Sequence, residues 1–163
     1  MAKILLVDDD PLLIRMYQKK FELDGHQVIT ASDGNLLFDQ LNNFKPEVIL
    51  LDVMMPELNG LETLKKLKAD EKHKSIPVVM LTNVGSSEKD SEAALEAGAV
   101  AYLVKASYTP KEIVQKVNEI ISGYTHEVLQ VKTKIKPASN EDSQHLNQDK
   151  IESDKVQVTV EDL

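Results

Sequence analysis

The chain has 163 residues, of which 42% are hydrophobic, and this is enough to bury the core of one domain with a short appendage. It contains no cysteine, so disulfides, thiolate catalysis and cysteine-ligated metals are excluded. The net charge is −8 and no Lys/Arg cluster is interleaved with aromatic residues, so we expect no direct nucleic-acid binding. No apolar run is long enough to span a membrane or to form a signal peptide, so we expect a soluble, cytoplasmic protein that makes no membrane contact.

Five short apolar runs predict buried strands at 3–7, 27–31, 48–51, 77–81 and 100–104. A helical pattern follows each strand, and residues typical of helix ends bound each pattern. The five predicted helices begin at Asp10-Pro11, Gly34, Gly60, Ser86-Ser87 and Thr109-Pro110, and they end, in the same order, at Gly25, Pro46, Asp70, Gly98 and Gly123. Strict alternation of strands and helices is typical of a parallel sheet with helices on both faces. We therefore predict a doubly wound, flavodoxin-like α/β fold with five strands in the order 2-1-3-4-5.

The composition changes after residue 123. Residues 1–123 make up the predicted α/β domain, whereas residues 124–163 contain no glycine and carry five lysines against eight acidic residues. Val156, Val158 and Val160 alternate with polar residues, as in a weak strand. We predict that 124–163 form a polar, acidic C-terminal tail that is flexible or partly extended, with an extended segment that pairs only on a partner.

Residues suited to metal and phosphate chemistry stand where four of the predicted strands end. They are Asp8-Asp9, Asp52, Thr82 and Lys105. In the order 2-1-3-4-5 the first and third strands are neighbours, so Asp8, Asp9 and Asp52 should share one crevice. Three carboxylates repel one another there unless a divalent cation neutralises them, and an all-oxygen ligand set favours Mg²⁺ or Mn²⁺ over Zn²⁺.

Such a cation leaves Asp52 able to attack phosphorus. The cation would absorb charge on the phosphoryl oxygens, Lys105 would add a positive charge, and the Thr82 hydroxyl would donate a hydrogen bond. The set therefore predicts a carboxylate nucleophile equipped for phosphoryl transfer. Taken alone, Asp52 could simply cap the helix that follows it.

Residues 3–122 resemble a receiver domain of the two-component response-regulator family. The matching segments are Val7-Asp8-Asp9, 50–56, Gly60, Leu81-Thr82 and 102–105. The resemblance implies a stand-alone phospho-receiver of the CheY-like type, because no output domain follows. It implies that Asp52 accepts a phosphoryl group from a sensor histidine kinase or a phosphotransfer protein. It also implies a module that catalyses its own phosphorylation and dephosphorylation without being a turnover enzyme.

The resemblance also implies roles for the neighbouring residues. Asp9, Asp52 and the Met54 carbonyl would bind Mg²⁺ directly, and Asp8 would act through water. Lys105 would contact the phosphoryl group, while Thr82 and Tyr102 would be the switch pair. Their movement would reshape the face formed by the fourth helix, fifth strand and fifth helix, and a downstream effector protein would recognise that face. Dimerisation on phosphorylation stays an open alternative that no residue here supports.

Two residues depart from the family pattern, namely Ala106 and Asn83, which follows Thr82 where the family most often has a small residue. Ala106 stands where the family usually has a proline, often in a cis peptide bond. Because a cis bond before a non-proline residue costs about 3 kcal/mol, we expect a trans bond or a locally different loop here. Ala106 also keeps open the alternative of a degenerate receiver that folds, is not phosphorylated and acts as a docking module.

Two other classes fit less well. A phosphatase of the haloacid-dehalogenase type usually has a second aspartate two residues after the first, and Met54 occupies that position. A flavin or nucleotide carrier would need a phosphate-binding loop after the first strand, where Asp8-Asp9-Asp10 would repel phosphate.

The remaining charged residues are interpreted as surface features. Asp10 is predicted to be a helix cap, and the histidines have no spacing typical of metal ligands. Two sets are interpreted as solvated, namely His26, His73, His126 and His145, and the lysines Lys65, Lys66, Lys68, Lys72 and Lys74.

Overall fold

The computed structural model describes residues 1–83, 88–126, 132–133 and 160–161. The sheet strands are β1 (Lys3–Val7), β2 (Gln27–Ala31), β3 (Val48–Leu51), β4 (Val78–Thr82) and β5 (Ala101–Val104). The helices are α1 (Pro11–Leu23), α2 (Gly34–Leu41), α3 (Gly60–Ala69), α4 (Glu88–Glu96), the 3-10 turn η1 (Lys105–Ser107) and α5 (Pro110–His126). Two short strands, β6 (Lys132–Thr133) and β7 (Val160–Glu161), come from the tail.

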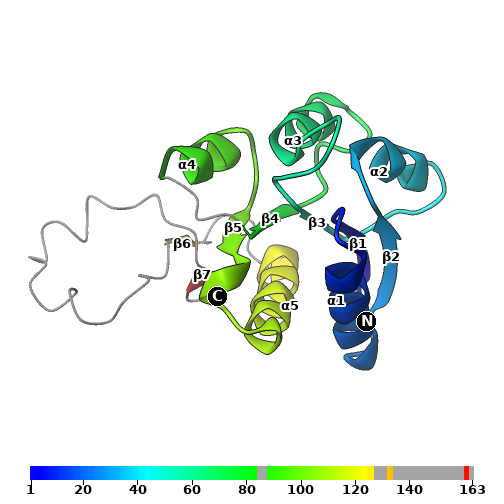
Figure 1. The fold of residues 1–163 in the computed structure, drawn as a ribbon, viewed down its shortest axis with the longest axis vertical. Helices are drawn as coiled ribbons and strands as arrows, with labels where there is room; N and C mark the ends of the chain where they lie inside the picture. The colour runs from blue at the N-terminus through cyan, green and yellow to red at the C-terminus, as the bar shows by residue number, and fades with distance from the viewer. Residues whose placement is uncertain (84–87, 127–131, 134–159, 162–163) are drawn as a thin grey trace, which may run out of the picture.

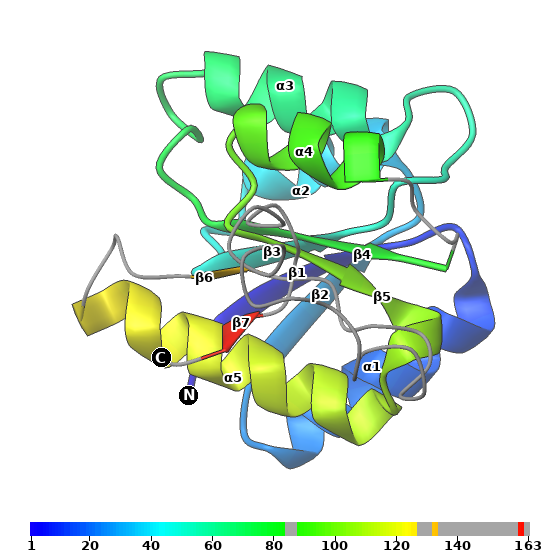
Figure 2. The same cartoon turned by 90° about the vertical axis from the view of Figure 1, so that its left-hand side faces the viewer.

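The five long strands form one parallel sheet in the order β2-β1-β3-β4-β5. Helices α1 and α5 cover one face of this sheet, and α2, α3 and α4 cover the other (Figures 1 and 2). Each crossover returns the chain to the same edge, so all five strands end on one side of the molecule. The predicted fold class is confirmed.

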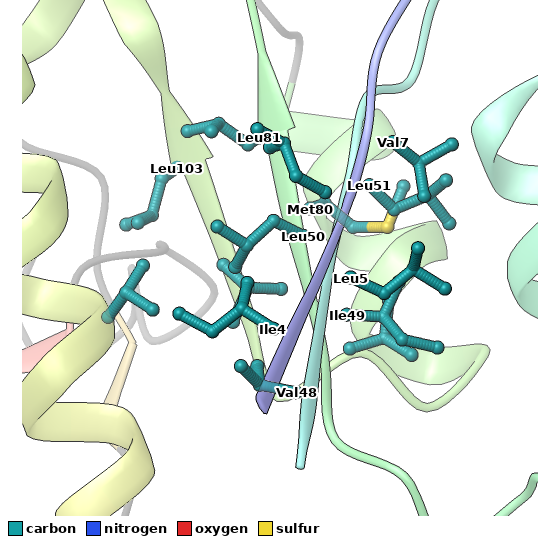
Figure 3. Close-up of a cluster of buried hydrophobic side chains, with 14 of the residues drawn as sticks. Ile4, Leu5, Val7, Val48, Ile49, Leu50, Leu51, Met80, Leu81 and Leu103 are labelled. Atoms are coloured by element: carbon teal, nitrogen blue, oxygen red, sulfur yellow. The ribbon is translucent and has the colours of Figure 1, made fainter. Parts of the chain in front are cut away.

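The core lies on both faces of the central strands. Every side chain of β3 and β4 is buried, as are four of the five in β1, and Figure 3 shows several of them packed together around β1, β3 and β4. Burial on both faces explains why these strands read as unbroken apolar runs without alternation. Each leucine or isoleucine removed from water in this way contributes about 1.5–3 kcal/mol, so the sheet is a rigid base for the loops at its edge.

Side-chain caps begin the helices at the predicted positions. Asp10 accepts hydrogen bonds from the backbone N–H groups of Leu12 (2.9 Å) and Leu13 (3.4 Å), which confirms its role as a cap. Asp33 and Asn59 cap α2 and α3 in the same way. These bonds satisfy N–H groups that have no partner inside the helix.

The end of the last helix differs from the prediction. We predicted that it stops at Gly123, but α5 continues to His126. A glycine inside a helix costs only about 1 kcal/mol, which the packing of the preceding turns can outweigh. Lys132–Thr133 and Val160–Glu161 pair antiparallel with each other. Pairing of the tail with a partner stays a prediction. Ser86, Ser87 and the rest of the tail lie outside the described residues.

The interpretation of His26 as a solvated residue is wrong. Its Nδ1 accepts a hydrogen bond from the Ala2 N–H (3.0 Å), and its Nε2 lies 2.7 Å from Oδ1 of Asn118 in α5. The ring also meets the edge of Phe21 at 6.1 Å between centroids. His26 therefore ties the N-terminus and α1 to α5, a contact between residues 92 positions apart that no local pattern indicates.

Replacing His26 by leucine should lower the free energy of unfolding by about 1–3 kcal/mol, because the Ala2 N–H and the Asn118 amide each lose a partner. Urea denaturation of both proteins measures this difference. Gln27→Leu, at the exposed neighbouring position, is the control and should change stability by less than about 0.5 kcal/mol. Equal effects of the two substitutions would contradict the assigned role of His26.

Lys68 likewise departs from its predicted solvated position. Its Nζ donates hydrogen bonds to the carbonyl oxygens of Lys74 (3.0 Å) and Ile76 (2.7 Å), so it orders the connection between α3 and β4. Burial lowers the pKa of this ammonium. Among the described residues, no helix is both long and apolar enough to cross a membrane.

Candidate functional site

Three carboxylates meet where β1 and β3 end. Val7 pairs with Leu51 in the sheet, and the Asp52 N–H donates to the Val7 carbonyl (3.0 Å), so the residues that follow the two strands are adjacent. One oxygen each from Asp8, Asp9 and Asp52 lies within 4.8 Å of the others. Asp8 and Asp52 are buried and Asp9 is exposed, so the cluster is reached from solvent on the Asp9 side. The structure thus brings together the three carboxylates that the sheet order predicted.

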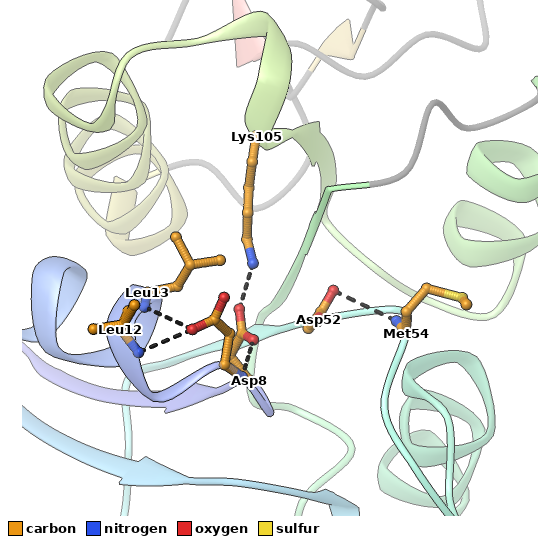
Figure 4. Close-up of polar contacts among 7 residues, drawn as sticks. Asp8, Leu12, Leu13, Asp52, Met54 and Lys105 are labelled. Atoms are coloured by element: carbon orange, nitrogen blue, oxygen red, sulfur yellow. Dashed lines mark hydrogen bonds and ion pairs between the residues drawn. The ribbon is translucent and has the colours of Figure 1, made fainter.

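Lys105 contributes a positive charge to the same site. It follows β5 and its Nζ donates to Oδ2 of Asp8, with both side chains only 5% exposed (Figure 4). Oδ1 of Asp8 accepts from the backbone N–H of Asp10 at 2.9 Å. Both oxygens of Asp8 are therefore occupied, and the ammonium that we predicted for a phosphoryl group bonds to Asp8 in this structure.

The environment of Asp52 raises the pKa of its carboxyl group. The pKa of this carboxyl is raised from 3.8 to about 6, mainly by burial and also by the charges of Asp8 and Asp9. The Lys105 ammonium and the Met54 N–H, which lies 3.4 Å from Asp52 Oδ1, lower the pKa but do not offset burial. Asp52 is therefore a carboxylate that lacks a sufficient counter-charge near neutral pH.

The residues at this edge fit a hard divalent cation. Three carboxylates offer oxygen ligands, and one lysine cannot balance their combined charge. Oxygen-only sets of this kind suit Mg²⁺ or Mn²⁺. A bound cation would favour the ionised form of Asp52 and so lower its pKa.

Thr82 and Tyr102 lie on neighbouring strands. Thr82 ends β4, pairs with Val104 and is fully buried. Tyr102 of β5 is 2% exposed and pairs with Met80, which lies two residues before Thr82 in β4. Because paired residues in a parallel sheet point to the same face, and so do residues two apart, Thr82 and Tyr102 share one face of the sheet. Their role as a switch pair stays a prediction.

Two further sequence predictions concern the loops at this edge. No cis peptide bond occurs in the described ranges, so the bond before Ala106 is trans as expected. Lys105, Ala106 and Ser107 form the turn η1, which leads from β5 toward α5. The Met54 side chain is 60% exposed, and the role of its carbonyl as a metal ligand stays a prediction.

Two residues near the site, Tyr17 and Gly60, have contacts that the sequence did not predict. Tyr17 of α1 is 3% exposed, and burial together with the charge of Asp8 raises the pKa of its hydroxyl to about 12. The approach of Tyr17 to Asp8 depends on how α1 packs, which the residue pattern does not show. Gly60 touches the backbone of Asp52 so closely that a Cβ there would overlap the Asp52 carbonyl oxygen.

Fold and site define the class of protein: a doubly wound α/β domain with an acidic pocket and a lysine at the point where the strand order reverses. The sequence profile of the response regulator receiver domain matches residues 4–118. The chain belongs to this family and is a receiver domain of the two-component response-regulator type. Receiver domains are signalling modules that interact with histidine kinases and effectors and bind Mg²⁺ through an acidic pocket.

Curated relatives extend beyond the segment that they share with this chain. The transcriptional regulatory protein CpxR of Escherichia coli (strain K12) is 43% identical over 121 residues, which are 74% of this chain and 50% of CpxR. The alkaline phosphatase synthesis transcriptional regulatory protein PhoP of Bacillus subtilis (strain 168) is 38% identical over 119 residues, covering 73% and 48%. The chain thus spans about half the length of these relatives.

Solved structures of similar proteins cover this chain up to its tail. The chemotaxis response regulator CheY4 of Vibrio cholerae is 32% identical with a TM-score of 0.67, over 74% of this chain and 98% of that one. The Mn²⁺-bound form of response regulator Rcp1 is 28% identical with a TM-score of 0.61, over 80% and 96%. The receiver fold accounts for the first three quarters of the sequence.

Proposed function

We propose that this protein is a phospho-receiver in which Asp52 accepts a phosphoryl group from the phosphohistidine of a sensor histidine kinase or a phosphotransfer protein. One observation carries the proposal: Asp52 is buried beside Asp8 and Asp9 at the carboxyl edge of the sheet, with its pKa raised and with Lys105 close by. In the transfer, the bond from Asp52 Oδ to phosphorus forms while the bond from phosphorus to the histidine nitrogen breaks. The imidazole leaves with that electron pair and takes up a proton.

The metal ligands of the proposal are Asp9, Asp52 and the Met54 carbonyl, with Asp8 acting through water. Mg²⁺ or Mn²⁺, when bound, supplies positive charge to the phosphoryl oxygens. The solved structure of Rcp1 carries Mn²⁺, which supports a divalent cation for this family. Asp9 is the exposed member of the cluster and offers the route by which the cation enters.

Lys105 and Thr82 act on the phosphoryl group in this proposal. Lys105 exchanges its bond with Asp8 for a bond to a phosphoryl oxygen, a short movement within one buried site. Thr82, at the end of β4, donates its hydroxyl to another phosphoryl oxygen. Both residues favour the phosphorylated state by contacts that exist only there.

The signal leaves through the face formed by α4, β5 and α5. Movement of Thr82 and Tyr102 would change this face, and a downstream effector protein would bind one of its two forms. The transcriptional role in the names of CpxR and PhoP belongs to those longer proteins. The module acts through protein contacts and is not an enzyme with turnover on a released substrate.

Incubation of the protein with Mg²⁺ and acetyl phosphate tests the proposal. We expect intact mass spectrometry to show one added phosphoryl group that hydroxylamine removes. EDTA should prevent the addition, and Asp52→Asn should abolish it. An unmodified wild-type protein, with acetyl phosphate and with histidine kinases as donors, would contradict the proposal and favour a docking module that is not phosphorylated.

A further inference from the structure

Tyr17 is a buried residue of α1 that has no part in the phosphoryl chemistry proposed for Asp52. It lies about two turns into the helix, and its side chain is 3% exposed. It shares the inward face of α1 with Leu13 and Phe21, which stand four residues before and after it. The helix begins at Pro11, directly after the acidic residues that follow β1. Tyr17 therefore packs along the helix whose first turn borders the acidic site.

The hydroxyl of Tyr17 lies within electrostatic reach of Asp8. Side chains on an α-helix lean toward its N-terminus, so the ring of Tyr17 covers the preceding turn. That direction leads to Asp8, which is bonded to the start of α1 through the Asp10 N–H and faces Lys105 (Figure 4). Burial raises the pKa of the Tyr17 hydroxyl, and so does the charge of Asp8, which acts in this way only from nearby. Helix geometry and electrostatics thus agree.

This hydroxyl is an unused hydrogen-bond donor. None of the residues that the structure describes accepts a hydrogen bond from it, and its oxygen still touches solvent. A phenol can donate one hydrogen bond, and an ionised carboxylate is a strong acceptor for it. Both oxygens of Asp8 are bonded to other donors in this structure, Oδ1 to the Asp10 N–H and Oδ2 to Lys105. The donor and the carboxylate are therefore neighbours without a bond.

Phosphoryl transfer would take one partner away from Asp8. In the proposed reaction, Lys105 exchanges its bond with Asp8 for a bond to a phosphoryl oxygen. Asp8 is only 4% exposed, so water replaces the ammonium poorly. A buried carboxylate that loses a donor is strongly destabilised, and this cost opposes the movement of Lys105. A second donor close to Asp8 would reduce the cost.

We propose that Tyr17 is a positioning residue for Asp8, and that its hydroxyl donates a hydrogen bond to Asp8 Oδ2 when Lys105 moves to the phosphoryl group. Tyr17 acts through Asp8 and does not contact the phosphoryl group. No covalent bond changes in this exchange of donors. Its effect on phosphoryl transfer rests on the proposed function of Asp52, whereas the exchange itself can be tested without phosphorylation.

A double-mutant cycle on the full chain, by urea denaturation in EDTA slightly above neutral pH, tests the exchange. Lys105→Met removes the ammonium and opens Asp8 Oδ2 to the hydroxyl. In wild type, Tyr17→Phe should change the folding equilibrium constant by less than about threefold, because no bond is lost. In Lys105→Met, it should lower this constant by about tenfold or more, because a hydrogen bond to a charged group is lost.

The control background is Lys68→Met, which removes another partly buried ammonium, from α3 on the opposite face of the sheet. Tyr17→Phe should act there as it does in wild type. Equal effects of Tyr17→Phe in wild type and in Lys105→Met would overturn the inference. If Lys105→Met does not fold, Lys105→Ala replaces it in the cycle, because the smaller side chain leaves room for water beside Asp8.

The rate of phosphorylation gives a second readout. With acetyl phosphate and Mg²⁺, Tyr17→Phe should slow the initial rate of phosphoryl addition by about tenfold, measured by intact mass. An unchanged rate would overturn the role of Tyr17 in the transfer. A wild-type protein that is never phosphorylated would contradict the proposed function of Asp52, while the double-mutant cycle still decides whether Tyr17 bonds to Asp8.

Discussion

Replacement of Asp52 by asparagine should raise the free energy of unfolding of the metal-free protein at pH 7 by about 1–3 kcal/mol. The folded protein raises the pKa of this carboxyl from 3.8 to about 6, so its ionised form is less favourable in the folded than in the unfolded state. One unit of pKa corresponds to about 1.4 kcal/mol. Asparagine is close in shape and carries no charge, so the variant avoids this penalty. Urea denaturation in EDTA measures the gain.

The pH dependence of this gain has a definite sign. A carboxyl whose pKa is raised on folding destabilises the folded state fully above the folded pKa, here about 6, and not at all below the unfolded value of 3.8. The stability difference between variant and wild type should therefore be largest at pH 7 and above and should disappear toward pH 4. Asp39→Asn removes the same charge at an exposed position and serves as the control. A variant less stable than wild type at pH 7 would contradict this account of Asp52.

Substitution of Gly60 by alanine should destabilise the protein by about 3 kcal/mol or more. A Cβ at this position would overlap the Asp52 carbonyl oxygen and lie 2.8 Å from the Val53 Cα, and backbone atoms cannot move aside as a side chain can. The Gly60 N–H also donates to the Val53 carbonyl at 2.9 Å, so displacement of α3 would break this bond. Thermal denaturation measures the loss.

Gly25→Ala is the matched control for Gly60→Ala. Gly25 has a φ of +86° but no atom within 4 Å of the added Cβ. Alanine there adds only backbone strain, which costs about 1–2 kcal/mol. The smaller effect at Gly25 would show that close packing against Asp52 dominates at Gly60. An unchanged melting temperature for Gly60→Ala would contradict the close contact between Gly60 and the Asp52 backbone.

The fold and the acidic cluster could be predicted because their determinants are local. Apolar runs end at Asp8 and Asp52, caps such as Asp10 begin the helices, and the alternation of elements leaves few parallel topologies. The strand order then places carboxylates that are far apart in sequence at one edge of the sheet. Each of these steps depends on residue type and spacing, which the sequence shows directly.

The contacts that could not be predicted depend on tertiary packing. His26 and Lys68 have ordinary surface spacing, yet one bonds to Asn118 in α5 and the other to the carbonyls before β4. The bond from Lys105 to Asp8 and the approach of Tyr17 to Asp8 likewise follow from how elements meet in space. The length of α5 beyond Gly123 reflects a weak local preference that packing outweighs.

The position of the phosphoryl group tests the central claim most directly. The protein would be treated with acetyl phosphate and Mg²⁺, reduced with borohydride, digested and sequenced by tandem mass spectrometry. Borohydride converts an aspartyl phosphate into homoserine, so the modified residue is identified after the labile group is gone. We predict homoserine at position 52 alone. Homoserine at Asp8 or Asp9 with Asp52 intact would contradict the assignment of Asp52 as the phosphoryl acceptor.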